Sequence, residues 1–161
     1  MEPRTVQDTS LIVSYAVMPS DANPIGNVHG GVIMKHVDNT GGIVAARHAR
    51  HFCVTASVDH LDFHNPAYIG ELLILKASIN LVGRTSMEVG VRVEAENMIS
   101  GELRHIASAY LTYVCLDENR KPTPVPPLIL ETDEDRRRNC AAEQRKAIRM
   151  KDRTAGPACD R

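Results

Sequence analysis

The order of apolar patterns along the chain is the feature that most limits its fold. One helix-like run, residues 32–48, is followed by four strand-like runs that begin at Cys53, Glu71, Arg84 and Leu103. Short turns between long strands favour antiparallel pairing in a meander. This order differs from the strand–helix alternation of parallel α/β folds. We therefore predict an α+β fold in which one antiparallel sheet packs against one long helix.

Two further segments flank this pattern. The run "SLIVSYAVM", residues 10–18, is apolar and β-branched, which predicts a fifth strand. After the Pro-rich stretch "ENRKPTPVPP", the chain is charged and helix-prone from Glu131 to Lys151. A chain of 161 residues can bury one hydrophobic core. We predict one domain over residues 8–130, then a charged C-terminal helix and tail over residues 131–161.

Composition argues against several classes of partner. The formal net charge is -1 and aromatic residues make up 4%, so neither a basic field nor stacking side chains indicate nucleic acid binding. No apolar run is long enough to span a bilayer, and "MEPRTVQDTS" lacks the apolar segment of a secretory signal. Cys53, Cys115, Cys140 and Cys159 are scattered. We expect four free thiols in a reducing cytoplasm and no metal on them.

Asp38 stands out in the helix-like run because its face is otherwise small and apolar. Met34, Gly41, Gly42 and Ala45 share that face. Two glycines inside a helix cost about 2 kcal/mol relative to alanine, so close approach of another backbone or of a ligand is expected to offset this cost. Partial desolvation makes a carboxylate a stronger base. The alternative is that Asp38 is solvated and the glycines mark a kink.

The sequence "HGG" before this helix predicts a site for developing negative charge. Amide groups near Gly30, Gly31 and Val32 would be unpaired at the positive end of the helix dipole. Such amides can stabilise an oxyanion, and a carboxylate lies two helical turns away. Together these groups would be the minimum needed for attack on an acyl carbon. An ordinary helix N-terminus is the alternative. His29 lies in the same loop. It is a candidate catalytic base, or a residue that positions the loop.

Four blocks of the sequence resemble the hotdog-fold acyl-CoA thioesterases. They are "PSDANPIGNVHGGVIMKHVDNTGGIVAARH", "VTASVDHLDFHNP", "VGRTSMEV" and "ASAYLTYVCLDENRKPTPVPPLILETDEDRRR". The resemblance covers about residues 10–150 and is greatest to the second domain of the two-domain, brain-type cytosolic long-chain acyl-CoA hydrolases. It implies a sheet of about five strands wrapped around a central helix. It also implies homodimers with active sites at the interface, commonly three dimers in a hexamer.

The resemblance also implies an activity and its residues. The reaction is hydrolysis of acyl-CoA to a fatty acid and coenzyme A, without a cofactor or metal. The family's catalytic Asp falls on Asp38 and its catalytic Asn on Asn23, with Asn27 as a second candidate. Asp38 acts as a general base or as a nucleophile that forms an anhydride, and both routes stay open. Two-domain relatives divide these roles between domains, so this chain would act as a homodimer with two equivalent sites.

The turn "VGRTS" offers donors for the phosphates of coenzyme A. These are the amides of Gly83 and Thr85, the guanidinium group of Arg84, and the hydroxyl groups of Thr85 and Ser86. The alternative is a hairpin turn with a solvated Arg, and the resemblance favours phosphate contact. The basic segment "RRRNCAAEQRKAIRMK" is expected to contact the nucleotide or a neighbouring subunit, or to form a solvated helix face.

Three alternative interpretations fit the sequence less well. A non-catalytic acyl-CoA sensor or scaffold on the same fold would keep the "VGRTS" contacts and lack a base. A hotdog dehydratase would need a His and an acid in a block that is absent here. His60, Asp62 and His64 share one strand face and could ligate a metal, but groups in a line close poorly around a tetrahedral ion. The preferred acyl-chain length stays open.

Overall fold

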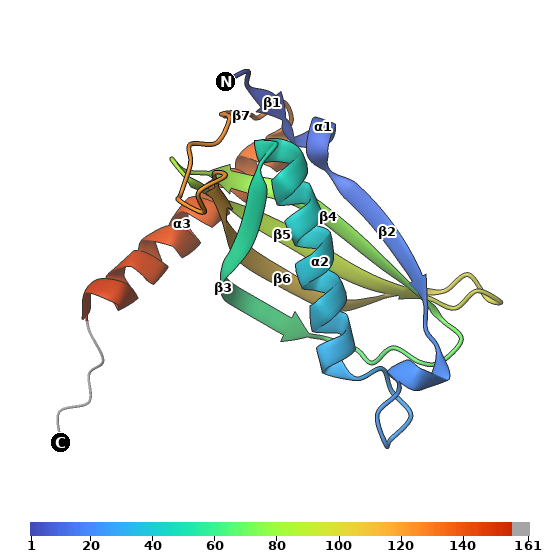
Figure 1. The fold of residues 1–161 in the computed structure, drawn as a ribbon. Coiled ribbons are helices and arrows are strands. Elements are labelled where there is room, and N and C mark those ends of the chain that lie inside the picture. The colour runs from blue at the N-terminus through green and yellow to red at the C-terminus, as the bar shows by residue number, and fades with distance from the viewer. Residues whose placement is uncertain (156–161) are drawn as a thin grey trace, which may run out of the picture.

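One antiparallel sheet packs against a central helix (Figure 1). The computed structural model describes residues 1–155. The sheet has five strands in the order β2 (Leu11–Ala16), β4 (Leu72–Val82), β5 (Ser86–Glu96), β6 (Leu103–Leu116) and β3 (Phe52–Phe63). Helix α2 (Gly30–Ala49) crosses one face of this sheet, and helix α3 (Asp133–Ala155) packs on the other (Figure 1). The predicted α+β class is confirmed.

Four short elements complete the chain. They are β1 (Arg4–Thr5), α1 (Val6–Thr9), the 3-10 helix η1 (Pro19–Asp21) and β7 (Leu128–Ile129). Strands β1 and β7 pair in parallel. The Arg47 guanidinium group donates to carbonyl oxygens of Asp8, Thr9 and Ser10, so the end of α2 is held against α1. The expected C-terminal tail, with Cys159, lies outside the described residues.

The predicted meander is right for three strands and wrong for β3. Strands β4, β5 and β6 follow one another in both sequence and space. Strand β3 precedes β4 in sequence but pairs with β6 at the far edge. The physical reason is that β2 takes the other side of β4, so the free side of β6 is the place left for β3.

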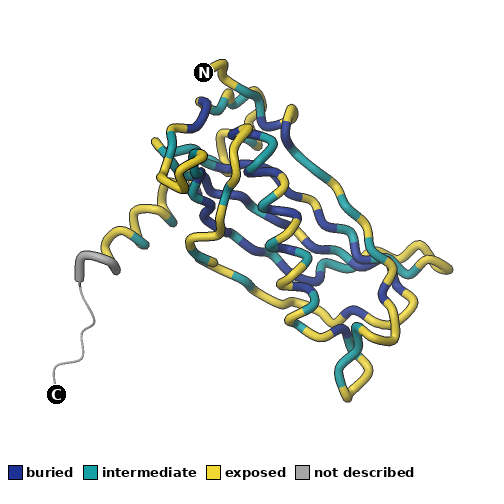
Figure 2. Tube along the Cα trace, viewed as in Figure 1, coloured by how far each residue is buried: buried dark blue, intermediate teal, exposed yellow. Residues whose placement is uncertain are grey.

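The core lies between the sheet and α2 (Figure 2). Alternate residues of β5 face α2 and are at most 2% exposed, as the alternation predicts: Met87, Val89, Val91, Val93 and Ala95. The buried face of α2 includes Ile33, Val37, Val44 and Ala45. Met34 departs from the predicted apolar stripe, because its side chain is 46% exposed.

Helix α3 covers polar groups on the outer face of the sheet. Glu88 is 3% exposed there, and Arg145 donates to both of its carboxylate oxygens, at 2.7 and 3.2 Å. Arg149 pairs with Asp59, and Ala142 is fully buried. The basic segment is therefore more than a solvated helix face, because its inward side chains neutralise the buried carboxylate of Glu88 and the partly buried one of Asp59. Within residues 1–155, no helix combines the length and apolarity needed to cross a bilayer.

Candidate active site

Asp38 lies on α2 where two strands bring hydroxyl groups to it. The Thr55 hydroxyl group donates to Asp38 Oδ1 at 2.5 Å. The Tyr113 hydroxyl group donates to the Asp38 carbonyl oxygen at 2.8 Å and lies 3.4 Å from Oδ1. Thr55 and Tyr113 are direct partners in the β3–β6 ladder, so one cross-strand pair holds the carboxylate. Asp38 is half-buried, which agrees with the partial desolvation predicted for it.

The two glycines behind Asp38 make room for Tyr113. A Cβ atom at Gly41 would lie 2.5 Å from the Tyr113 hydroxyl oxygen, and one at Gly42 would lie 3.6 Å from the ring. The close approach predicted from the glycines is present, although it comes from a side chain rather than from a backbone or ligand. Burial, and then the charge of Asp38, raise the pKa of Tyr113 far above its usual value. Tyr113 is therefore a permanent hydrogen-bond donor at neutral pH.

The N-terminus of α2 differs from the expected cluster of free amides. His29 is the N-cap, and its Nδ1 atom accepts a hydrogen bond from the Gly31 amide at 2.9 Å. The Val32 amide donates to the His29 carbonyl oxygen at 2.9 Å. Two of the three expected amides are thus occupied: the imidazole of His29 accepts from Gly31, in the capping role usually taken by Ser, Thr, Asp or Asn, and its backbone carbonyl group accepts from Val32. Among the described residues, only the Gly30 amide of the three lacks an acceptor.

Asn23 organises the loop before α2. Its Oδ1 atom accepts hydrogen bonds from the amides of Ile25, at 3.1 Å, and Asn27, at 3.2 Å. Both asparagines line a cavity of about 390 Å³. The other lining residues are Val28, Gly30, Ile33, Phe63, His64, Asn65, Pro66 and Ala67. This cavity brings Asn23, Asn27 and Gly30 together.

Within one chain, the cavity and Asp38 are separate. Asp38 follows Gly30 by eight positions in α2, which corresponds to about 12 Å along the helix axis. Asp38 is absent from the cavity lining. One chain therefore presents two separate groups of candidate residues: the Asn23 loop, and the Asp38 carboxylate with its hydroxyl donors.

The "VGRTS" turn lies beyond the same end of the sheet as Tyr113. The Gly83 amide donates to the Ser86 carbonyl oxygen at 2.7 Å, which closes a tight hairpin, and Arg84 is exposed. Met87 pairs with Tyr113, so Thr85 lies two residues, or about 7 Å, farther along the strand. The Arg84 guanidinium group and the hydroxyl groups of Thr85 and Ser86 thus lie toward the end of the sheet where Tyr113 contacts Asp38.

Sequence reasoning missed Thr55 and Tyr113. Both belong to predicted strands, but neither stood out from the other polar residues of those strands. The glycine pair carried the only signal, because Gly41 and Gly42 together imply a large partner on the facing sheet. Tyr113 is the one Tyr of β6 that is almost fully buried, at 1% exposure.

The His60–Asp62–His64 set does not form a cluster. The His60 Nε2 atom lies 2.6 Å from Asp62 Oδ2, and both side chains are half-exposed. His64 instead packs against His105, with ring centroids 4.5 Å apart. Across residues 1–155, no three His, Cys, Asp or Glu side chains are arranged to hold a metal ion.

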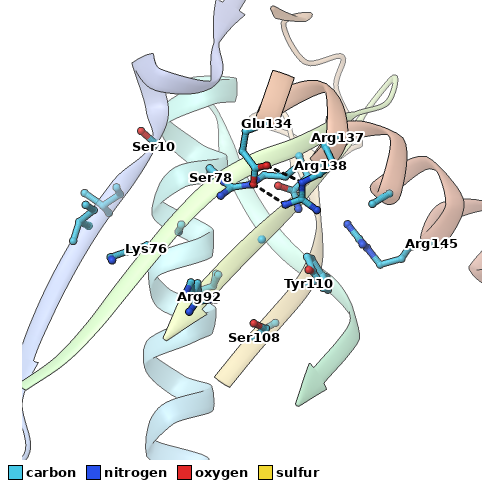
Figure 3. Close-up of a pocket in the computed structure, with 18 residues that line it drawn as sticks. Ser10, Lys76, Ser78, Arg92, Ser108, Tyr110, Glu134, Arg137, Arg138 and Arg145 are labelled. Atoms are coloured by element: carbon cyan, nitrogen blue, oxygen red, sulfur yellow. Dashed lines mark hydrogen bonds and ion pairs between the residues drawn. The ribbon is translucent and has the colours of Figure 1, made fainter. Parts of the chain in front are cut away.

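A second groove, of about 410 Å³, lies on the outer face between the sheet and α3 (Figure 3). Its cations are Lys76, Arg92, Arg137, Arg138 and Arg145. Each of them has a carboxylate partner: Glu94 binds the first two, Glu134 the next two, and Glu88 the last. The cations of this groove are thus all paired within the chain, although five cations share three carboxylates, and the sheet separates the groove from Asp38. We interpret it as the seam along which α3 docks.

Comparison with known proteins places this geometry in a family. The model of the thioesterase superfamily matches residues 25–102. The cytosolic acyl coenzyme A thioester hydrolase of Rattus norvegicus is 40% identical over 139 residues, which cover 85% of this chain and 36% of that protein. The chain thus spans about a third of that relative's length. The uncharacterized acyl-CoA thioester hydrolase YkhA of Bacillus subtilis is 38% identical, over 83% of this chain and 78% of YkhA.

Solved structures agree in both fold and length. An apo-hexameric acyl-CoA thioesterase superposes with a TM-score of 0.92 at 36% identity, over 98% of this chain and 99% of that one. An acyl-CoA hydrolase of Staphylococcus aureus, in complex with butyryl coenzyme A, coenzyme A and coenzyme A disulfide, gives 0.88 at 31% identity, over 94% and 93%. The latter hydrolase was also crystallised with an aspartate, an asparagine or a threonine replaced by alanine. With these identities over almost its whole length, the chain belongs to the thioesterase superfamily of hotdog-fold proteins.

Proposed function

We propose that this protein hydrolyses acyl-CoA thioesters to a carboxylic acid and coenzyme A. The observation that carries the proposal is the carboxylate of Asp38, half-buried on α2 and bound by the hydroxyl group of Thr55. Coenzyme A and butyryl coenzyme A in the related Staphylococcus aureus structure support the same ligand class here.

Residue spacing supports the assignment of the reacting groups. In the Staphylococcus aureus hydrolase, the replaced aspartate follows the replaced asparagine by 15 positions, and the replaced threonine follows that aspartate by 17. The same spacings separate Asn23 from Asp38 and Asp38 from Thr55. These spacings favour Asn23 over Asn27 as the catalytic asparagine, and they add Thr55 to the site.

The hydrogen bonds of Asp38 leave one oxygen for chemistry. Thr55 and Tyr113 both approach Oδ1, and no donor among the described residues approaches Oδ2. In our proposal, Oδ2 takes a proton from the attacking water, or attacks the thioester carbon directly and forms an anhydride that water then cleaves. Thr55 fixes the rotamer of the carboxylate in either route. Both routes give the same products.

A homodimer would complete each site. Strand β3 is the last strand on its side of the sheet, and its exposed side chains include Phe52 at 84%, Val58 at 49% and Phe63 at 49%. Long apolar edge strands tend to pair with another chain. Two-fold antiparallel pairing of β3 with its copy would place the end of one strand, where Phe63 lines the Asn23 cavity, beside the start of the other, where Thr55 holds Asp38.

In such a dimer, the Asn23 loop and the Asp38 carboxylate of different protomers would have complementary roles. The loop of one protomer would contribute Asn23 and the free amide of Gly30 to orient the water and to stabilise the oxyanion. Its partner would contribute Asp38 and Thr55. Arg84, with the amides and hydroxyl groups of the "VGRTS" turn, would bind the phosphates of coenzyme A. We further propose that three such dimers form a hexamer, as in the related apo-hexameric thioesterase.

The decisive experiment combines two inactive variants. We expect Asp38→Asn and Asn23→Ala each to abolish release of coenzyme A from butyryl- and palmitoyl-CoA, with folding and coenzyme A binding retained. Asp62→Asn, on the exposed face of β3, is the matched control and should remain active. Dissociating and reassociating equal amounts of the two inactive variants should restore about a quarter of wild-type activity, because half of the dimers would carry one intact site of two.

Each outcome has a definite meaning. No recovery in the mixture would contradict the shared site, while full activity of Asp38→Asn would remove Asp38 from the mechanism. The alternative function, a non-catalytic acyl-CoA sensor on the same fold, predicts that wild-type protein binds palmitoyl-CoA and releases no coenzyme A.

A further inference from the structure

Two cysteines face each other beside the Asp38 site. Cys53 on β3 and Cys115 on β6 are direct cross-strand partners, and their sulfur atoms lie 2.9 Å apart. Cys115 is fully buried, whereas Cys53 is half-buried. The sequence alone gave no sign of this pair, because 62 residues separate its members.

The backbone at this pair suits a disulfide bond. The Cys115 amide donates to the Thr85 carbonyl oxygen, and the Cys115 carbonyl oxygen accepts from the Thr123 amide. Both groups therefore point away from β3, which makes Cys53 and Cys115 a narrow, non-hydrogen-bonded pair with Cα atoms about 4.5 Å apart. That separation falls within the range that disulfide bonds span. The sulfur atoms need to approach by less than about 1 Å to reach bonding distance.

The two thiols differ in reactivity. A hydrogen bond from the Cys115 thiol lowers the pKa of Cys53 below its usual value. The same contact, and then burial, raise the pKa of Cys115. Because the thiolate is the nucleophile in thiol chemistry, Cys53 is the attacking group, and its partial exposure lets a reagent reach it. Cys115 is then in place to resolve the product.

We propose that Cys53 and Cys115 form a thiol–disulfide exchange site whose substrate is a small-molecule disulfide of the coenzyme A type. The Cys53 thiolate attacks one sulfur of the substrate, forms a mixed disulfide and releases one thiol. Cys115 then loses its proton and attacks Cys53, which releases the second thiol. In total, two protein thiols are oxidised to one disulfide, and one substrate disulfide is reduced to two thiols. The choice of substrate rests on the proposed function, since coenzyme A would be the bound thiol.

Formation of the disulfide would change the surroundings of Asp38. Thr55 and Tyr113 are the cross-strand pair two positions along the same face of β3 and β6. Drawing the sulfur atoms of Cys53 and Cys115 together moves these side chains and changes the packing beside Thr55 and Tyr113. The donor of the 2.5 Å hydrogen bond to Asp38 then shifts, and displacements of this size in a catalytic group reduce turnover. We expect the oxidised protein to hydrolyse acyl-CoA more slowly than the reduced protein, and dithiothreitol to restore the rate.

The test uses full-length protein with Cys140→Ser and Cys159→Ser, so that only this pair can react. After incubation with coenzyme A disulfide, we expect a mass loss of two hydrogens per chain and release of two coenzyme A thiols. Adding Cys115→Ser should trap coenzyme A on Cys53. Adding Cys53→Ser should give no adduct, because Cys115 is buried. Absence of the internal disulfide, or equal labelling of both single-thiol variants, would overturn the exchange site.

A second probe separates recognition from simple thiol reactivity. Glutathione disulfide should react at least tenfold more slowly than coenzyme A disulfide, and equal rates would overturn the choice of substrate. Acyl-CoA hydrolysis is measured on the reduced protein in parallel. Loss of exchange with hydrolysis intact rejects the exchange site alone. Exchange without hydrolysis rejects the proposed function and leaves the dithiol chemistry in place.

Discussion

The phenol of Tyr113 occupies the space that a side chain at Gly41 would need, with only 2.5 Å between the hydroxyl oxygen and a Cβ atom at that position. Gly41→Ala should therefore destabilise the protein by about 1–3 kcal/mol, although alanine is the better helix former. Gly42→Ala is the matched control, because its added methyl group would sit at an ordinary 3.6 Å from the ring. Urea unfolding of both variants measures the difference, and equal free energies of unfolding would contradict this contact.

Thr55 should act on turnover through its hydroxyl group. Thr55→Val keeps the branched shape that suits a strand and removes the donor to Asp38 Oδ1. Hydrogen bonds to charged groups contribute about 1.5–3 kcal/mol, so we expect kcat/KM for butyryl-CoA to fall by roughly ten- to a hundredfold. Thr55→Ser retains the hydroxyl group and should stay within a few-fold of wild type. A Val variant as active as the Ser variant would show that the hydrogen bond has no catalytic role.

Arg84 should affect binding more than chemistry. It is exposed in the "VGRTS" turn, and replacing it with alanine removes a cation from the proposed phosphate site. We expect Arg84→Ala to raise KM several-fold and leave kcat nearly unchanged. Arg92→Ala removes another exposed arginine, from the outer face of β5, and is the control. Steady-state kinetics with acyl-CoA distinguish the two, and an unchanged KM for Arg84→Ala would exclude it as a phosphate contact.

The docking of α3 should depend on Glu88. This carboxylate is buried and accepts hydrogen bonds from Arg145 and Asn80, so Glu88→Gln leaves an unpaired guanidinium group at the seam. We expect a loss of about 2–4 kcal/mol in the free energy of unfolding. Glu134→Gln removes a solvent-exposed partner of Arg137 and should change stability too little to measure. Chemical denaturation of the two variants gives the comparison. Similar free energies of unfolding would show that the buried Glu88 carboxylate does not stabilise the docking of α3.

Stability should fall as the solution becomes acidic, and His48 should contribute to the loss. Burial lowers the pKa of His48, although its hydrogen bond to the Pro126 carbonyl oxygen opposes this shift. As the pH drops below about 6.5, the unfolded chain takes up a proton at this residue before the folded chain does. The free energy of unfolding should therefore decrease between pH 7.5 and 5.5.

Two variants isolate the contribution of His48. His48→Asn should show a smaller decrease over that range than wild type, as measured by urea unfolding at several pH values. His51→Asn changes an exposed histidine just beyond the same helix and serves as the control. An identical pH profile for His48→Asn and wild type would remove His48 from the acid response.

Periodicity predicted most of the fold, since α2 and the strands extend along the chain much as their apolar patterns indicate. The place of β3 could not be predicted in this way. Local sequence defines a strand, but its partner depends on which sheet edge is free after the other strands have paired. The burial of Glu88 could not be predicted either. A charged residue is expected to be exposed, and the sequence does not show that Arg145 lies close enough to neutralise it.

In the candidate site, too, local sequence patterns could be predicted and contacts made through strand pairing could not. Asp38 could be singled out because a carboxylate on a small, apolar helical face is visible in the sequence itself. Thr55 and Tyr113 act through strand pairing, which the sequence does not display. The amides of Gly31 and Val32 were predicted to be free, because neither the unusual His29 side-chain cap on Gly31 nor the bond from Val32 to the His29 carbonyl group shows in the sequence. The catalytic roles of Asp38 and Asn23 stay predictions until the variants are measured.

The pairing of β3 with β6 also sets the order of events during biosynthesis. Strand β3 ends at Phe63, and β6 begins at Leu103. At ordinary translation speeds the ribosome needs about 2–8 s to add the intervening residues. During that time the nascent chain carries Asp38 and Thr55 without Tyr113 to join them. A chain stalled or cut before residue 103 would lack the partner strand of β3, and its apolar edge would be open to self-association.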